Sequence, residues 1–111
     1  MESDTTTTIK LTGDLSISDA ADLKSKFLLL LQEYNTINID ISGLEDFDAA
    51  IIQILFATCI QAKKEKKEIV FKGSVIQPVR RKMFLSGLID SMELTDEAVL
   101  QQITRKIRVA T

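Results

Sequence analysis

The hydrophobic period of this chain changes from two to about 3.6 between Thr36 and Ala62, and this change constrains the fold more than any other feature. Ile37, Ile39 and Ile41 alternate with polar residues, which is the pattern of a β-strand with one face on a core. From Ala49 onward the apolar residues recur at helical spacing and form a wide face. The sequence therefore predicts a half-buried strand that leads into a buried helix.

The connection between this strand and this helix is short and acidic. Ser42 and Gly43 are predicted to end the strand, and Glu45, Asp46 and Asp48 form the connection. Asp48 stands where an N-cap acceptor is needed, and its carboxylate also suits the positive end of the helix dipole. Because function is often located at a turn before a helix, this turn is the first candidate site.

The rest of the chain alternates between strand and helix patterns. Strands are predicted at Thr5–Leu11, Glu68–Lys72 and Ser91–Thr95, and Leu15–Ile17 are expected to add a short extended segment. Helices are predicted after Ser16 or Ser18, from Pro78 to Gly87, and from Asp96 onward. This order favours crossover connections, so we predict one α/β domain over residues 1–111. Its sheet is expected to be mixed, mostly parallel and four- to five-stranded, with about four helices packed mainly on one face.

The first predicted helix has one clear apolar stripe, which includes Leu23 and Phe27. Leu28 and Leu29 fall outside this stripe. They belong either to a wider buried face or to a partner surface, and burial is the commoner outcome for leucine.

Composition excludes several classes of function. The net charge is −2 and the pI about 5.1, so no cationic field points to nucleic acid or to an anionic membrane. The chain has no histidine and one cysteine, Cys59, and it has no glycine-rich phosphate loop, so we expect no metal, no cofactor and no catalysis. The start of the chain has no secretory pattern and no apolar run is long enough to span a bilayer; cytoplasmic localisation is therefore expected.

Three motifs resemble those of the STAS domain family, which includes bacterial anti-sigma-factor antagonists. Near the start, LTGDL matches the family's L-x-G-x-L, and near the end SGL matches its distal S-G-L. In the centre, DISGLEDFDAA is similar to D-L-S-x-L-x-x-[ILF]-D-S-S-G through Asp40, Ser42, Leu44, Phe47 and Asp48. The likeness covers about Thr8 to Leu94 and implies the STAS fold.

The resemblance implies a partner-switching function, with one departure from the family pattern. In anti-sigma-factor antagonists, a kinase phosphorylates the first serine of D-S-S-G at the start of the central helix. Here Ala49 and Ala50 follow Asp48, and alanine has no hydroxyl, so no phosphosite is expected at Ala49. The resemblance therefore implies an antagonist or scaffold fixed in the unphosphorylated state.

We predict a protein-interaction module, with a serine kinase of the GHKL type as the expected partner. The predicted partner-binding residues surround the acidic turn: Ser42, Glu45, Asp46, Asp48, Ala49, Ala50 and Gln53. Two simpler interpretations stay open, because Asp48 can serve only as a helix cap and Ser42 only as a local backbone partner. The alternative function is an accessory subunit that braces the ATPase of a bacterial lipid-transporting ABC system. A small-molecule or nucleotide sensor ranks last, because no binding motif supports it.

Overall fold

The computed structural model describes residues 5–110, with side chains as far as residue 107. In chain order its elements are β1 (Thr6–Leu15), α1 (Ile17–Glu33), β2 (Thr36–Phe47), α2 (Ala49–Lys64), β3 (Glu68–Lys72), α3 (Gln77–Leu85) and α4 (Asp96–Ala110). The strands form one sheet in the order β1-β2-β3, and both pairings are parallel. The predicted α/β fold is therefore confirmed.

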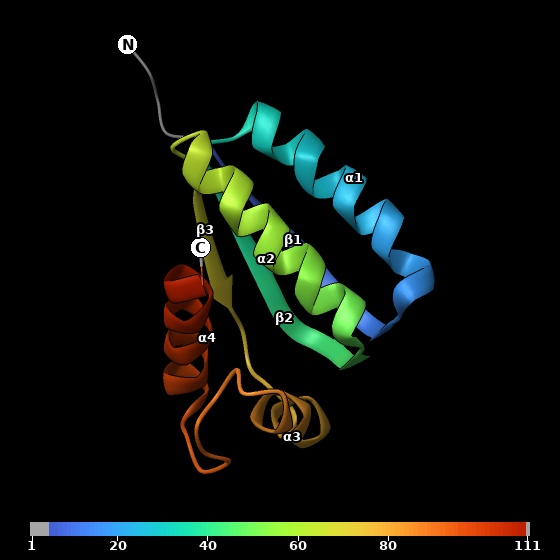
Figure 1. The fold of residues 1–111 in the computed structure, drawn as a ribbon, viewed down its shortest axis with the longest axis vertical. Helices are drawn as coiled ribbons and strands as arrows, with labels where there is room; N and C mark the ends of the chain where they lie inside the picture. The colour runs from blue at the N-terminus through green and yellow to red at the C-terminus, as the bar shows by residue number, and fades with distance from the viewer. Residues whose placement is uncertain (1–4, 111) are drawn as a thin grey trace.

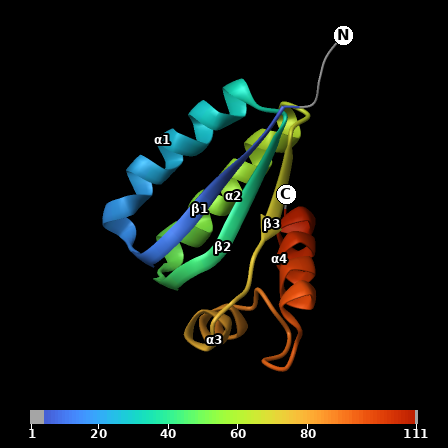
Figure 2. The same cartoon turned by 180° about the vertical axis from the view of Figure 1, so that it is seen from behind.

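The helices are not distributed evenly over the sheet. Helices α1 and α2 lie on one face, α3 lies at the end of the sheet where β2 ends, and α4 runs beside β3 (Figure 1). Figure 2 shows the opposite side, where β1 and β2 lie in front of α2 without a helix over them. Thr6, Thr8 and Lys10 are exposed on this uncovered face, whereas Ile9 and Leu11 are buried. The prediction that helices pack mainly on one face is confirmed.

The core lies between the sheet and its helical layer, because each element directs its apolar face inward. Ile37, Ile39 and Ile41 are buried in β2, as their alternation predicts. The other elements contribute residues at the expected spacing: Leu23, Phe27 and Leu31 from α1, Ile51 and Ala62 from α2, Val79 and Met83 from α3, and Val99, Ile103 and Ile107 from α4.

The predicted number of strands and the mixed character of the sheet were wrong. The sheet of the described residues has three strands, not four or five, and its pairings are all parallel. Leu15 is the last residue of β1 and Ile17 the first of α1, so no separate strand forms between them.

The segment Ser91–Thr95 is a loop, because its backbone groups find a partner outside the sheet. The carbonyl oxygens of Met92 and Leu94 accept hydrogen bonds from the guanidinium of Arg80. Arg80 also donates to Asp96 Oδ1 at 2.8 Å and is 8% exposed. A buried arginine therefore satisfies the carbonyls that a neighbouring strand would satisfy in a sheet.

Strand β2 does not end at Ser42 and Gly43, contrary to the sequence-based prediction. It continues to Phe47 beside the second half of β1, with register shifts between Lys10 and Thr12 and between Gly13 and Asp14. Leu44 and Phe47 are each 4% exposed. Irregular pairing thus lets the strand pass Gly43 and still bury two further apolar side chains.

Leu28 and Leu29 are exposed, so their predicted burial was wrong. Their exposed fractions are 43% and 57%. The stripe of Leu23, Phe27 and Leu31 faces the sheet, and the two other leucines therefore point away from it. In the part of the chain that the structure describes, no helix has the length and apolar character needed to span a bilayer.

Candidate functional site

The carboxylate of Asp48 caps two helices at once. Its Oδ1 accepts a hydrogen bond from the backbone nitrogen of Ala50 at 3.0 Å, which makes Asp48 the N-cap of α2. Its Oδ2 accepts one from the backbone nitrogen of Ile17 at 2.8 Å, in the first turn of α1. The two helices consequently start beside each other at the carboxyl end of the strands (Figure 1).

Asp46 joins this end of the sheet to α3. Its Oδ1 accepts a hydrogen bond from Lys82 Nζ at 2.5 Å and another from the backbone nitrogen of Phe47 at 2.8 Å. Lys82 Nζ also lies 5.8 Å from the centre of the Phe47 ring. The Lys82 ammonium, followed by the Phe47 N–H, lowers the pKa of Asp46, and the carboxylate is therefore the favoured form.

The remaining predicted residues of the turn lie on the same surface. Glu45 is exposed at the end of β2, and Ala49 and Gln53 are exposed in the first turns of α2. Ala50 is half-buried and donates its N–H to Asp48. We call this region the helix-start surface: Ile17, Glu45, Asp46, Asp48, Ala49, Ala50 and Gln53.

Two apolar residues at this end of the molecule were missed by the sequence analysis. Ile17 is 73% exposed and directly adjoins Asp48 through its backbone N–H. Leu85 is 71% exposed and lies one helical turn after Lys82, on the same side of α3. The sequence did contain a signal for the exposure of Ile17, because this residue lies between Ser16 and Ser18 and outside the apolar stripe of its helix.

Ser42 is the one predicted site residue that the structure does not bring to the helix-start surface. It lies six residues before Asp48, a separation of roughly 20 Å along a strand. Its Oγ accepts a hydrogen bond from the backbone nitrogen of Ser74 at 3.1 Å, just after β3. This contact fits the local backbone role that the sequence left open for Ser42.

The helix-start surface is rich in acidic residues. Asp14 is the register partner of Asp46, Glu45 directly precedes Asp46, and Asp48 follows the end of β2 and accepts a hydrogen bond from the exposed Ile17. Within the described residues, no group of three or more acidic or cysteine side chains is arranged to hold a metal ion. Acidic residues beside an exposed apolar side chain are compatible with contact to a protein of opposite charge.

Comparison with protein families identifies the chain. The family model described as "Mlab, STAS domain" matches residues 1–101. The chain belongs to the STAS domain family. The resemblance of the three sequence motifs to this family is thereby confirmed. A comparison with curated proteins gives no match.

Solved structures with the same STAS fold include anti-sigma factor antagonists. The anti-sigma factor antagonist SpoIIAA in its unphosphorylated form is 18% identical, with a TM-score of 0.64 and coverage of 79% of this chain and 77% of that one. The Bacillus cell fate determinant SpoIIAA in its phosphorylated form is 17% identical, with a TM-score of 0.59 and coverage of 78% of each chain. An anti-sigma factor antagonist from Mycobacterium paratuberculosis is 22% identical, with a TM-score of 0.59 and coverage of 94% and 90%.

Proposed function

We propose that this STAS domain is a non-enzymatic interaction module of the anti-sigma factor antagonist kind, and that its helix-start surface binds a protein partner. The observation that carries the proposal is the double cap by Asp48. Because one carboxylate fixes the starts of α1 and α2, exposed Ile17 and Ala49 are held beside each other on one rigid surface.

The chemistry of this surface indicates the chemistry of the partner. Glu45 and Asp48 contribute negative charge, and Asp46 shares its charge with Lys82. Ile17 supplies an apolar side chain with little competing contact from its own protein. We therefore expect a partner with a basic rim around a small apolar pocket, because such a surface complements both properties.

Because residue 49 is alanine, phosphorylation at this position cannot regulate the proposed interaction. Its methyl side chain has no phosphoacceptor oxygen, and it is exposed in the first turn of α2. A phosphoserine there would add about 1.5–2 negative charges to a surface that is already acidic. Phosphorylation at this position therefore cannot switch the binding off.

The first candidate partner is a serine kinase of the GHKL type. A second candidate function is the accessory subunit that braces the ATPase of a bacterial lipid-transporting ABC system. It is kept because the matching family model bears the description "Mlab, STAS domain" and not that of an anti-sigma factor antagonist. Both candidates use a protein partner, so one binding experiment tests them together.

The experiment measures binding of the purified domain to each candidate, taken from the organism that encodes this chain. We expect saturable binding to one candidate and at least a tenfold loss of affinity in Ala49→Glu, because this variant adds charge and bulk at the centre of the surface. Ala57→Glu is the matched control, since Ala57 is also exposed on α2 but lies two turns away. Equal affinity of Ala49→Glu and Ala57→Glu would contradict the proposed surface, and no binding to either candidate would contradict the proposed function.

A further inference from the structure

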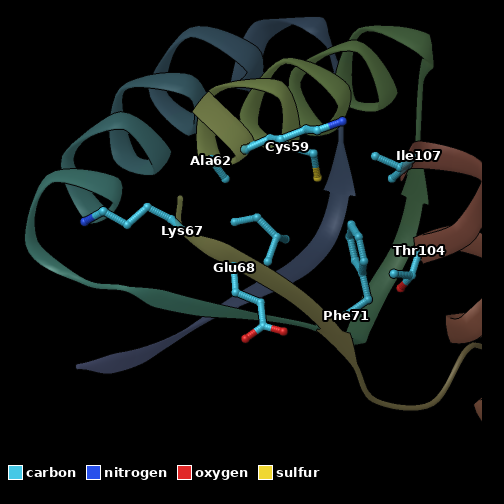
Figure 3. A pocket seen from close by; sticks show the side chains of 9 residues that line it. Cys59, Ala62, Lys67, Glu68, Phe71, Thr104 and Ile107 are labelled. Atoms are coloured by element: carbon cyan, nitrogen blue, oxygen red, sulfur yellow. The ribbon is translucent and has the colours of Figure 1, made fainter. Parts of the chain in front are cut away.

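A cleft opens at the opposite end of α2, where the C-terminal half of this helix meets β3 and α4 (Figure 3). Its volume is about 280 Å³. This is close to the lower end of the range for small-ligand sites, which begins at about 300 Å³. Because a 16-residue helix is about 24 Å long, the cleft is well separated from the helix-start surface.

The floor of the cleft is apolar and reaches the core. Ala62, Ile69, Phe71 and Ile107 line it, and each is at most 9% exposed. In Figure 3 the ring of Phe71 and the sulfur of Cys59 point into the space between β3 and α2, and Ile107 faces it from α4. Residue 62, which lines the cleft from α2, carries only a methyl group. An aliphatic chain would therefore find apolar contacts on three sides.

Some polar side chains around the cleft already form hydrogen bonds with other described residues, and others do not. Lys67 Nζ donates to the carbonyl oxygen of Tyr34 at 2.9 Å, and Thr104 Oγ1 donates to that of Leu100 at 2.9 Å. The side chains of Lys67 and Glu68 point away from the cleft in Figure 3. The Lys63 side chain is exposed, and its ammonium group forms no hydrogen bond or ion pair with any described residue. Its ammonium group is thus the charge available to a ligand.

The chain segment around Lys63 also carries a net positive charge. Lys63, Lys64, Lys66 and Lys67 follow one another closely, and only Glu65 and Glu68 oppose them. The carboxylate of Glu65 already accepts a hydrogen bond from Gln61 Nε2. A surplus of positive charge beside an apolar cleft favours a ligand with an anionic end and an apolar body.

We propose that this cleft binds a single-chain aliphatic anion, with the chain on the apolar floor and the anionic group at Lys63. One methylene group fills about as much space as one water molecule, about 30 Å³, so the cleft accommodates roughly nine such groups. The matching length is an eight- or nine-carbon chain. An ammonium group attracts carboxylate and phosphate alike, so both belong to the ligand class.

The test is an NMR titration of the ¹⁵N-labelled domain with octanoate, octyl phosphate and the uncharged octanol. We expect saturable shifts of the amides of Ala62, Ile69 and Thr104 with at least one of the two anions, and the anion that saturates them identifies the head group. Lys63→Gln should weaken anion binding about two- to fivefold and leave octanol binding unchanged. Lys64→Gln is the matched control, since Lys64 does not line the cleft.

Filling the cleft tests the apolar part of the proposal. Ala62→Leu should reduce anion affinity more than tenfold, whereas Ala57→Leu on the outer side of the same helix should not change it. If circular dichroism shows that Ala62→Leu does not fold, Thr104→Phe blocks the same cleft from α4. The absence of saturable shifts with both anions, equal affinity for octanol, or unchanged binding in the filled variants would each overturn the proposal. None of these results bears on the partner surface at the other end of α2.

Discussion

Gly73 is held in a conformation and a position that a side chain would disturb. Its φ is +106°, which is outside the regions that residues with a Cβ readily adopt. A Cβ at this position would also collide with Ser42 Oγ and with Asp40 Oδ1. Because Asp40 Oδ1 accepts from Ser42 N and Ser42 Oγ accepts from Ser74 N, these oxygens are fixed. The close approach of the chain after β3 to the middle of β2 therefore requires glycine here.

We expect Gly73→Ala to destabilise the protein by about 2–4 kcal/mol, because backbone strain and steric overlap add. Gly13→Ala is the control: Gly13 also has a positive φ, +74°, but a Cβ there meets no atom within 4 Å. It should cost only the strain, about 1 kcal/mol. Urea unfolding followed by far-UV circular dichroism measures both. Equal losses in the two variants would show that the contact with Ser42 and Asp40 is unimportant.

At the scale of single residues, the sequence predicted conformations better than contacts. It placed the end of the third helix at Gly87, which has a φ of +83° and follows the last turn of α3 closely. It did not place Gly73 against Ser42, since these residues are 31 positions apart. It also gave no indication that Arg80 is buried against the loop before α4. Such contacts depend on how distant elements pack.

Helices α1 and α2 are linked at their first turns by one side chain. Asp48 accepts from Ala50 N in its own helix and from Ile17 N in the other. At the start of α1, Ser16 N additionally donates to Asp19 Oδ2 at 2.8 Å. The carboxylate of Asp19 accepts a hydrogen bond at the start of one helix, whereas that of Asp48 accepts hydrogen bonds at the starts of two helices.

Asp48→Ala should therefore cost about 2 kcal/mol in the free energy of unfolding, roughly twice the value of an ordinary cap. Asp19→Ala, the single-helix comparison, should cost about 1 kcal/mol. Asp48→Asn should fall between wild type and Asp48→Ala, because an amide keeps one acceptor oxygen and loses the other. Urea unfolding measures the three variants together. A loss in Asp48→Ala no larger than in Asp19→Ala would mean that the bond to Ile17 does not contribute.

At the scale of elements, the helix positions, their apolar faces and the bounds of β3 followed from the sequence, whereas the lengths of β1 and β2 did not. The period of 3.6 correctly placed Leu23, Phe27 and Leu31 on the buried side of α1. Strand β2 extends beyond Gly43 because β1 continues beside it and supplies partners. The segment from Ser91 to Thr95 has a strand-like composition but no strand to pair with. Pairing is a property of two segments, so one segment cannot reveal it.

Among the described residues, three aspartates have pKa values that are lowered by local contacts. The Ser42 N–H lowers the pKa of Asp40, and Lys82 lowers that of Asp46. The hydrogen bond from Lys106, at 2.8 Å, lowers the pKa of Asp90. Groups with a lowered folded-state pKa stabilise the protein above the ordinary value of 3.8, and this stability is lost as the pH falls through the folded-state pKa.

We therefore expect the melting temperature to be nearly constant between about pH 5 and 8, since the chain has no histidine, and to fall in acid. The fall should begin near pH 4 and continue below it, and it should be smaller at high salt, which screens the exposed pairs. Asp90→Asn should show a shallower fall than wild type, because one of the three contributing carboxyl groups is gone. Melts by circular dichroism across this range measure the effect. A transition near pH 6.5 would contradict the prediction.

The sequence by itself determined the fold class, the family and the apolar face of each helix, because these depend on local periodicity and on motifs within short segments. It also correctly chose Asp48 as a cap, since the position before a helix and the chemistry of a carboxylate suffice for that inference. Only the tertiary structure decided that the same carboxylate caps a second helix, that no further strand of residues 5–110 lies beside β3, and that a cleft lined by Ala62 opens below α2. Each of these results depends on which distant surfaces meet and how much volume remains between them, and no local pattern carries that information.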